Sequence, residues 1–511
     1  MEFFARISVT LEQNTTHREC MRTLKFIRGI VCLGLILTLS ACNTSSKHAA
    51  GIKKIYQQSA QYHLPDRNPV IVIPGILGSR LIDENSGTTV WGAFRANYAK
   101  PNTDNGRQLI ALPIDTTFIS DNDHIHVEHE SAHIEPDGVL ENIKLNLAGF
   151  PVSIQAYAGI LTTLGAGGYR DETLGLNTID YGADHFTCFQ FDYDWRRDLA
   201  YNAKKFEEFI TAKRLYVQEQ YAIRYGLSDV DVKFDVVAHS MGALLARYYL
   251  RYGGQPLPED GTPPELTWAG GNNVERAILV APPNAGSLEA FDQLVNGFNV
   301  GRPLLPYYPP SLLGTFPSVY QLLPRSRHKA VVWDGNEENV VNDLLDPQLW
   351  QKMEWGLASK DEETQDMLQS LLPYAEGNKA RHEIALKYQA DALTRAKQFQ
   401  TAIDLPAKPP KGLDLYLVAG DATEAIEVMS IDSQSGDISV LRKGIGDKTV
   451  LRSSALMDER VNGEWEPFLQ APIEWSSVLF VPAQHREITS DPVFENNVLY
   501  WLLEEPRADS P

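Results

Sequence analysis

The stretch that most constrains this 511-residue chain is residues 232–250, where a strand-like run meets a helix-like run. Residues 232–237 read Val-Lys-Phe-Asp-Val-Val, a β-branched and apolar pattern typical of a buried parallel strand. Residues 243–250 repeat apolar side chains at helical spacing. The pentapeptide AHSMG, at residues 238–242, joins the two runs. The segment therefore predicts a strand, a sharp turn and a helix in immediate succession.

A serine on such a turn is typical of a nucleophile elbow, usually written G-x-S-x-G. Small residues two positions before and after Ser240 let the strand and the helix approach closely while the hydroxyl stands exposed. Ala238 replaces the first glycine and adds only a methyl group, and Gly242 keeps the second. The alternative interpretation is an ordinary strand–helix corner with a chance serine. The motif favours an α/β-hydrolase fold.

Short apolar runs alternate with helix-like patterns along most of the chain. Strands that alternate with helices predict a mostly parallel sheet covered on both faces. The predicted fold class is α/β, an α/β-hydrolase fold with a large helical cap insertion. The predicted strands are residues 69–74, 186–191, 232–237, 274–280, 413–418 and 476–481, and the predicted helices include residues 202–225 and 491–503.

Two segments break this alternation. Residues 81–150 are predicted to form an irregular insertion. Residues 285–405 begin with a proline-rich stretch and continue as amphipathic helices, which resembles a cap over an active site. The predicted core is then residues 68–284, with the insertion at about 82–140, and residues 406–511.

The composition is that of an ordinary globular protein, with 43% hydrophobic and 22% charged residues. The formal net charge is −20. Such an acidic chain repels the phosphate backbone, so the charge argues against a nucleic-acid partner.

The N-terminal segment has the pattern of a bacterial lipoprotein signal. Basic residues within 22–28 precede the apolar run 29–38, and Leu-Ser-Ala-Cys at 39–42 closes it. The resemblance implies cleavage before Cys42 and a diacylglycerol on its thiol. The alternative is a plain secretory signal with a coincidental cysteine. Residues 1–41 are thus a predicted signal segment, with Met21 as a candidate natural start, followed by a polar tether.

The remaining cysteines agree with this hypothesis. Cys20 and Cys32 would leave with the signal, so only Cys188 would remain as a free thiol, inside an apolar strand pattern. The sequence therefore predicts no disulfide framework and a buried, structural Cys188. Asn43 after the lipidated cysteine resembles lipoproteins sent to the outer membrane, so the expected location is the bacterial cell envelope.

A serine nucleophile needs a histidine base, and the histidine needs a carboxylate that fixes its tautomer. In this fold the chain order is serine, acid, histidine. His485 stands a few residues after the last predicted strand, where the fold requires its base. His328 and His382 belong to the predicted cap and are expected to be solvated.

Two aspartates are candidates for the acid. Asp421 follows the predicted strand 413–418 almost directly. Asp447 comes later, after a hairpin-like excursion at about 424–443. Position alone favours Asp421.

Several further stretches carry motifs, namely residues 69–81, Gly168-Tyr169-Arg170-Asp171-Glu172-Thr173, Tyr193-Asp194-Trp195-Arg196, residues 281–287, Gly446-Asp447-Lys448-Thr449-Val450 and His485. Together they resemble the lecithin:cholesterol acyltransferase family, which includes a lysosomal phospholipase and the phospholipid:diacylglycerol acyltransferases. The resemblance covers about residues 68–503, with residues 82–140 and 325–410 poorly matched.

The resemblance assigns roles that position leaves open. It implies that Asp447 is the acid and His485 the base, and leaves Asp421 as a structural acid at a strand end. An oxyanion needs preorganised backbone N–H donors, and Met241, the residue after the nucleophile, supplies one. By the resemblance, Ile76 supplies the other.

The chain departs from the family's mammalian members in two ways. It lacks the cysteines that pin their lipid-binding lid, and its cap sequence differs. Trp91, in the insertion, is either a membrane contact or a packed core residue. The motif at 193–196 is interpreted as structural, with an Arg–carboxylate pair that braces the substrate cleft.

The predicted function is a serine acyl-enzyme acting on lipid esters, an O-acyltransferase, a phospholipase or a lipase. Its partners would be a lipid substrate, an acyl acceptor (an alcohol or water) and, through the anchor, a membrane surface. No cofactor is implied. The alternatives are a non-catalytic envelope lipoprotein that binds lipid or protein on a hydrolase fold, and a general short-chain carboxylesterase.

One competing pattern is a histidine cluster. His124, His126, His129 and His133 lie within ten residues. A divalent-metal site there is conceivable, because His124 and His126 would share a strand face. Exposed polar loops also collect histidines by chance, so the sequence predicts no metal site.

The lipid anchor gives the first testable prediction. The change Cys42→Ser should abolish lipid modification, because the thiol is the predicted attachment point, and should leave the precursor unprocessed or release the protein from membranes. Metabolic labelling with a fatty-acid analogue and membrane fractionation measure both effects. Unlabelled wild-type protein, with fractionation unchanged in the variant, would contradict the anchor.

Overall fold

The computed structural model describes residues 51–115, 133–175, 185–300, 306–462 and 466–507, except residues 53, 94–96, 141, 148–149 and 156. The chain divides into two compact units, residues 1–57 and 58–511. The predicted signal segment and Cys42 lie outside the described residues. None of the described helices combines the length and apolar character needed to cross a membrane.

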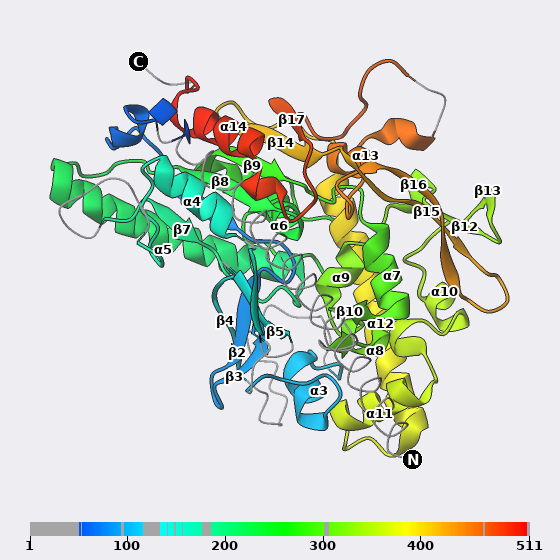
Figure 1. Ribbon diagram of the computed structural model, residues 1–511. Helices are drawn as coiled ribbons and strands as arrows, with labels where there is room; N and C mark the ends of the chain where they lie inside the picture. Colours follow the sequence, from blue (N-terminus) through cyan, green and yellow to red (C-terminus); the bar gives the residue numbers. More distant parts are fainter. Residues whose placement is uncertain are drawn as a thin grey trace, which may run out of the picture. The chain divides into compact units, whose positions relative to one another are not determined.

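A six-stranded parallel sheet forms the centre of the second unit (Figure 1). Its strand order is β17-β14-β9-β8-β1-β7, and every neighbouring pair runs parallel. The parallel sheet predicted from the sequence is confirmed. The strands are β1 (Val70–Ile73), β7 (Cys188–Gln190), β8 (Phe234–His239), β9 (Val274–Val280), β14 (Asp414–Gly420) and β17 (Ser477–Val481).

Helices cover both faces of this sheet (Figure 1). Because side chains alternate along a strand, Val70 and Val72 of β1 pack with α4 and α14. Ile71 and Ile73 point the other way, into the core that contains α5 and α6. These helices are α4 (Ala158–Ala166), α5 (Leu199–Tyr225), α6 (Met241–Tyr252) and α14 (Pro492–Leu503).

Local signals set the ends of the long helix α5. The carboxylate of Asp198 accepts hydrogen bonds from the N–H groups of Ala200 and Tyr201, which lack partners within the helix. Gly226 ends the helix in the left-handed region at φ 67°. Because a capping aspartate and a terminal glycine mark its two ends, the predicted bounds of α5 (202–225) lie close to the observed bounds (Leu199–Tyr225).

The expectation of an irregular insertion at 81–150 is wrong for its described part. This part contains a three-stranded sheet in the order β3-β2-β4 and a two-stranded sheet of β5 and β6. Short strands separated by polar turns carry little periodic signal, so the sequence pattern missed them. The elements are β2 (Ser79–Asp83), β3 (Thr88–Trp91), α3 (Asp104–Ile110), β4 (Ile134–Val139), β5 (Asn142–Leu147) and β6 (Phe150–Gln155).

Trp91, at the end of β3, is a core residue. Its side chain is buried, and its ring packs edge-on against Trp195 and Tyr308. Its indole N–H donates to the carbonyl of Leu77, 2.9 Å away. Of the two alternatives for Trp91, the structure supports packing over membrane contact.

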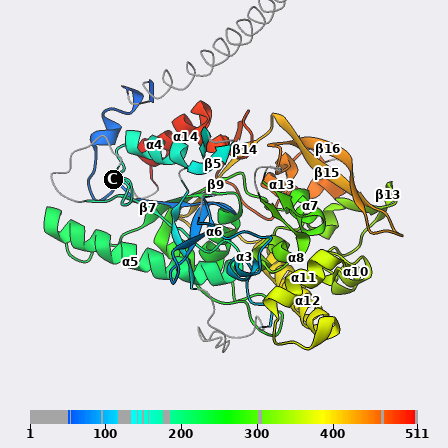
Figure 2. The same cartoon turned by 60° about the horizontal axis from the view of Figure 1, so that its bottom comes forward.

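The predicted cap is not wholly helical. It contributes β12 (Val331–Trp333) and β13 (Asn336–Val340), which join the hairpin of β15 (Thr423–Ile431) and β16 (Ile438–Gly446) in one sheet. Figure 2, like Figure 1, shows this sheet towards the same side as cap helix α10 (Pro347–Lys352). β12 pairs with β15, a strand far away in sequence, so no local pattern reveals the partnership.

The end of the longest cap helix is held by the helix that follows Ser240. Arg247 of α6 donates to the carbonyl of Ile403, and Arg251 donates to that of Leu405, at 2.6 and 2.7 Å. Cations stabilise the carbonyl end of a helix. The cap is thus fastened directly to the elbow helix.

The remaining elements complete the second unit. The other helices and strands are α7 (Leu288–Asn296), β10 (Phe298–Asn299), β11 (Tyr307–Tyr308), α8 (Pro310–Leu313), α9 (Pro317–Gln321), α10 (Pro347–Lys352), α11 (Glu362–Leu371), α12 (Gly377–Asp404) and α13 (Arg452–Leu456). The 3-10 helices are η1 (Ser59–Gln61), η2 (Ala269–Asn273), η3 (Ser326–His328), η4 (Gly356–Ala358), η5 (Glu459–Asn462) and η6 (Ile488–Ser490).

Candidate active site

Ser240 sits on the turn between β8 and α6, as the sequence predicts. Its backbone has φ 55° and ψ −126°, which a residue with a side chain rarely adopts. A backbone of this kind costs on the order of 1–3 kcal/mol and persists where the surroundings enforce it. The turn lifts the Ser240 side chain out of both the strand and the helix.

Two glycines make room for the turn. A methyl group on Gly242 would lie 2.2 Å from the carbonyl oxygen of Pro74, at the end of β1. A methyl group on Gly75 would lie 2.7 Å from Cβ of Ser240. Since atoms cannot approach so closely, only glycine allows the turn after β1 to lie against the elbow.

Ser240, His485 and Asp447 come together in one hydrogen-bonded series. His485 Nε2 lies 2.8 Å from Ser240 Oγ, and His485 Nδ1 lies 2.7 Å from Asp447 Oδ2. All three side chains are buried. The backbone N–H of His485 also donates to the carbonyl of Asp447 at 2.9 Å. The series has the connectivity of a Ser–His–Asp triad.

The segment around Asp447 explains its sequence motif. Asp447 Oδ1 accepts the N–H groups of Thr449 and Val450 at 3.0 and 2.7 Å, which leaves Oδ2 for His485. Lys448 adopts the left-handed region at φ 83° to close this tight turn. Gly446 allows the turn because a methyl group there would lie 2.3 Å from the carbonyl oxygen of Val450.

The same contacts set the charge of Asp447. Burial alone would raise its pKa, but His485 and the two backbone N–H groups outweigh burial and bring the pKa below its ordinary value. Asp447 is therefore ionised at neutral pH and can accept the Nδ1–H of His485.

Asp421 lies near this series but does not join it. The structure places it directly after β14, half-buried, with its N–H donating to Val481 at 3.4 Å. In the described chain no hydrogen bond links Asp421 to His485. A methyl group on Gly420 would lie 2.5 Å from Cβ of Asp447, so Asp447 occupies the space beside the end of β14. Both aspartates thus belong to one strand end, which explains why position alone is ambiguous.

The turn that contains Ile76 is fixed by aromatic side chains. Two tyrosines hold its start: Tyr193 Oη donates to Pro74 O at 3.0 Å, and Tyr157 Oη accepts from Gly75 N–H at 2.6 Å. Two tryptophans hold the residues that follow. Their Nε1–H groups donate to carbonyl oxygens, Trp91 to Leu77 at 2.9 Å and Trp195 to Ser79 at 3.3 Å. Among the described residues, no hydrogen bond uses the N–H of Ile76 or of Met241. Both predicted oxyanion donors therefore keep a free N–H, and the turn that carries the Ile76 N–H is held by these hydrogen bonds.

Arg196 braces this region from behind. Its guanidinium forms a two-point pair with Asp194, at 2.9 and 2.8 Å, and the same guanidinium donates to the carbonyls of Leu109 and Ile110. The predicted Arg–carboxylate pair is confirmed. It ties the segment before α5 to the insertion.

The other predicted histidines are not part of the site. The expectation that His328 is solvated is wrong, because its side chain is 8% exposed and its Nε2 lies 3.0 Å from Glu459 Oε2. Glu459 is far away in sequence, so the contact had no local signal. His382 is half-buried and lines a hollow in the cap.

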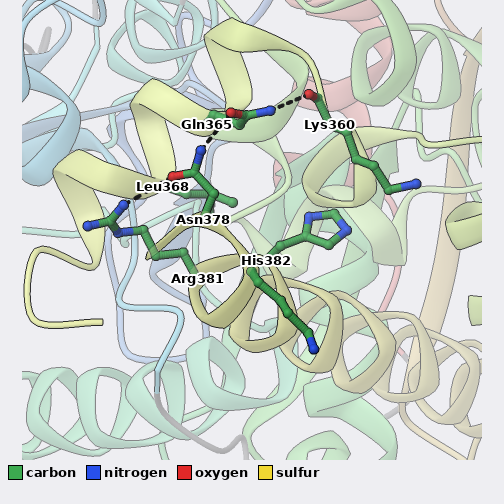
Figure 3. Close-up of a pocket in the computed structure, with 7 residues that line it drawn as sticks. Lys360, Gln365, Leu368, Asn378, Arg381 and His382 are labelled. Carbon is green, nitrogen blue, oxygen red and sulfur yellow. Dashed lines mark hydrogen bonds between the residues drawn. The ribbon is translucent and has the colours of Figure 1, made fainter. Parts of the chain in front are cut away.

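That hollow has a volume of about 200 Å³ (Figure 3). Its polar groups bond to one another. Gln365 donates to the carbonyl of Lys360 at 2.6 Å, and Asn378 donates to Gln365 at 2.7 Å. The described residues that line the hollow include no Asp, Glu, Ser, Thr or Cys side chain. Its lining residues are Lys360, Gln365, Leu368, Asn378, Lys379, Arg381 and His382.

Two further sequence hypotheses concern a metal site at the histidine cluster and the state of Cys188. His124, His126 and His129 lie outside the described residues, and His133 is described. Across the described part of the chain, no group of three or more His, Cys, Asp or Glu side chains could hold a metal ion. Cys188 is buried, and burial raises the pKa of its thiol well above the ordinary value, as a structural cysteine requires.

Two residues of the site were missed by the sequence analysis. His239 and Tyr157 lie behind Ser240, and their side chains form a hydrogen bond of 3.0 Å. His239 directly precedes Ser240 in the sequence, and this position could have marked it as a residue of the site. Tyr157 directly precedes α4 and contacts a residue far away in sequence, and nothing in its own sequence marks it.

A comparison with protein families places this geometry in context. The family model described as lecithin:cholesterol acyltransferase matches residues 143–421, more than half of the chain. The match includes Ser240 and ends before Asp447 and His485. None of the curated proteins matches the chain.

Solved structures with similar chain courses include a chain of the Tle4–Tli4 complex, at 14% identity and a TM-score of 0.49, covering 86% of this chain and 98% of that one. Lipase 1 from Pelosinus fermentans has 14% identity and a TM-score of 0.25, covering 54% of this chain and 72% of its own. The Staphylococcus hyicus lipase has 13% identity and a TM-score of 0.22, covering 52% and 68%. Likeness at this level says nothing about substrate.

Proposed function

This chain belongs to the lecithin:cholesterol acyltransferase family, and on that premise we propose that it is a serine acyl-enzyme acting on lipid esters. The observation that carries the proposal is the buried hydrogen-bonded series of Ser240, His485 and Asp447. Family membership supports a lipid-ester hydrolase or acyltransferase. The series supplies the machinery that such chemistry needs.

The proposed first half of the reaction forms an acyl-enzyme. Ser240 Oγ attacks the ester carbonyl while His485 Nε2 takes the hydroxyl proton, and ionised Asp447 stabilises the imidazolium. The N–H groups of Ile76 and Met241 stabilise the oxyanion of the tetrahedral intermediate. The intermediate then breaks the ester C–O bond, and His485 returns the proton to the leaving alcohol.

The second half of the reaction transfers the acyl group. An acceptor hydroxyl gives its proton to His485 and attacks the acyl-enzyme, and the collapse of the second tetrahedral intermediate frees Ser240. Water as acceptor gives a fatty acid, whereas an alcohol gives a new ester. The balance depends on how well the cap excludes water and binds the alcohol.

Lipid anchoring through Cys42 belongs to the same proposal. The signal pattern at residues 22–42 supports it, and the anchor would hold Ser240 close to a bilayer, where phospholipids and acylglycerols lie. The proposed location is the bacterial cell envelope, with the outer membrane favoured by Asn43. The labelling of Cys42→Ser described above tests this part.

The choice of acid gives a prediction with a built-in control. The change Asp447→Asn should lower kcat by about 10⁴-fold, because an amide at this position favours the wrong tautomer of the histidine. Asp421→Asn should keep a kcat near the wild-type value. Asp421 is a matched control because it directly follows Gly420, which packs against Asp447. Steady-state kinetics on one lipid ester measures both variants. A large loss in Asp421→Asn with an active Asp447→Asn would reverse the assignment.

Substrate class gives a further prediction. Purified mature protein should cleave long-chain phospholipid in vesicles and prefer it to butyrate esters, because each buried CH₂ contributes about 0.8 kcal/mol. Vesicles with acyl-labelled phosphatidylcholine, with and without a long-chain alcohol, distinguish the products. Free fatty acid alone indicates a hydrolase, and a new ester indicates an acyltransferase.

The outcomes also separate the alternatives. Cleavage of short soluble esters with vesicles left intact would indicate a general carboxylesterase. No turnover of any ester, in protein that binds vesicles, would indicate a non-catalytic lipoprotein. Ser240→Ala provides the blank for each assay.

A further inference from the structure

A chain of hydrogen bonds runs behind Ser240 from the turn after β1 to the loop that carries His485. Tyr157 Oη lies 2.6 Å from Gly75 N and 3.0 Å from His239 Nδ1. His239 Nε2 lies 3.0 Å from the backbone carbonyl oxygen of His485. We call these four residues the Tyr–His bridge. It links segments that meet only in the folded site.

Hydrogen-bonding capacity fixes the direction of each bond in the Tyr–His bridge. The N–H of Gly75 can only donate, so Tyr157 Oη accepts there and its single proton goes to His239 Nδ1. The carbonyl of His485 can only accept, so His239 Nε2 carries a proton. His239 is therefore neutral, protonated on Nε2 alone, and every polar group along the bridge has a partner.

Burial keeps both side chains of the bridge uncharged. Burial and the nearby His485 lower the pKa of His239 to about 3. Burial also raises the pKa of Tyr157 far above its ordinary value. The ring of His239 lies 4.9 Å from that of His485, so a charge on His239 would oppose the formation of imidazolium on His485.

Each end of the bridge holds a part of the proposed machinery. At one end, the Pro74–Gly75 peptide is fixed on both sides, because Tyr193 donates to its carbonyl and its N–H donates to Tyr157. The next N–H along the chain is that of Ile76. At the other end, the backbone of His485 is fixed by Asp447 on its N–H and by His239 on its carbonyl.

We propose that Tyr157 and His239 are positioning residues. They hold the turn that carries Ile76 and the loop that carries His485 in fixed positions relative to Ser240. They touch no reacting atom and transfer no proton. Their effect is to hold Ile76 N–H and the His485 imidazole in the geometry that the transition state needs. The proposal rests on the proposed function, because the positions of Ile76 N–H and the His485 imidazole affect activity only if Ser240 is acylated.

The matched test compares two tyrosines that each accept a backbone N–H. Tyr157→Phe removes the acceptor of Gly75 N–H. Tyr216 lies on α5, and its Oη accepts the N–H of Phe186 at an N···O distance of 3.0 Å, so Tyr216→Phe removes an acceptor outside the Tyr–His bridge. Tyr157→Phe should lower kcat about 10- to 100-fold with KM unchanged, less than the roughly 10²- to 10³-fold loss of an oxyanion donor itself. Tyr216→Phe should keep the wild-type kcat while showing a comparable fall in Tm.

A second pair of variants tests the chemistry of His239. A glutamine side chain can both accept and donate, as a neutral imidazole does, so His239→Gln should retain more kcat than His239→Leu. Equal kcat in these two variants, or a kcat for Tyr157→Phe within twofold of wild type, would overturn the proposal.

The bridge can be tested apart from activity. Nitrogen-15 NMR of the histidines should show His239 as the neutral Nε2–H form at pH 6, with its Nδ1 signal shifted in Tyr157→Phe. An Nδ1–H form, or a signal indifferent to Tyr157, would overturn the bridge even in an active enzyme. If no ester is turned over but the signals behave as stated, the proposed function fails and the positioning role fails with it, while the hydrogen bonds stand.

Discussion

The close approach of the turn after β1 to the Ser240 elbow is the constraint on which the rest of the site depends. Gly242 lies against the Pro74 carbonyl, and Gly75 lies against Ser240, so the two turns cannot separate without opening the centre of the sheet. The cost of the strained Ser240 backbone is offset by this packing. The fold thus brings a hydroxyl and the free N–H groups of Ile76 and Met241 to one place.

The acid and the base reach that place by different routes. His485 comes from the loop after β17, an edge strand of the parallel sheet. Asp447 arrives at the end of the long hairpin β15–β16, whose far end is held by the cap, since Trp355 donates to the carbonyl of Gly436 at 2.8 Å. The cap is therefore connected to the acid through the hairpin, and to the nucleophile through the α6 contacts of Arg247 and Arg251.

Much of this arrangement could be predicted from the sequence, because buried parallel strands and the elbow have strong local patterns. The order of Ser240 and His485 along the chain followed from the fold once the elbow was identified. Only the family motif distinguishes Asp447 from Asp421 in the sequence, because both aspartates lie at the same strand end. The short strands of the insertion were missed because they carry little periodic signal. β12 and the role of Tyr157 were missed because each depends on a partner far away in sequence, which no local periodicity encodes.

The proposed mechanism requires that a lipid ester acylate Ser240. The most direct measurement is the intact mass of protein quenched with acid during turnover of a long-chain ester, followed by peptide mapping. We expect a mass increase of one acyl group on the peptide that contains Ser240, and none in Ser240→Ala. An unmodified Ser240 peptide during active turnover, or an acyl group on another residue, would contradict it.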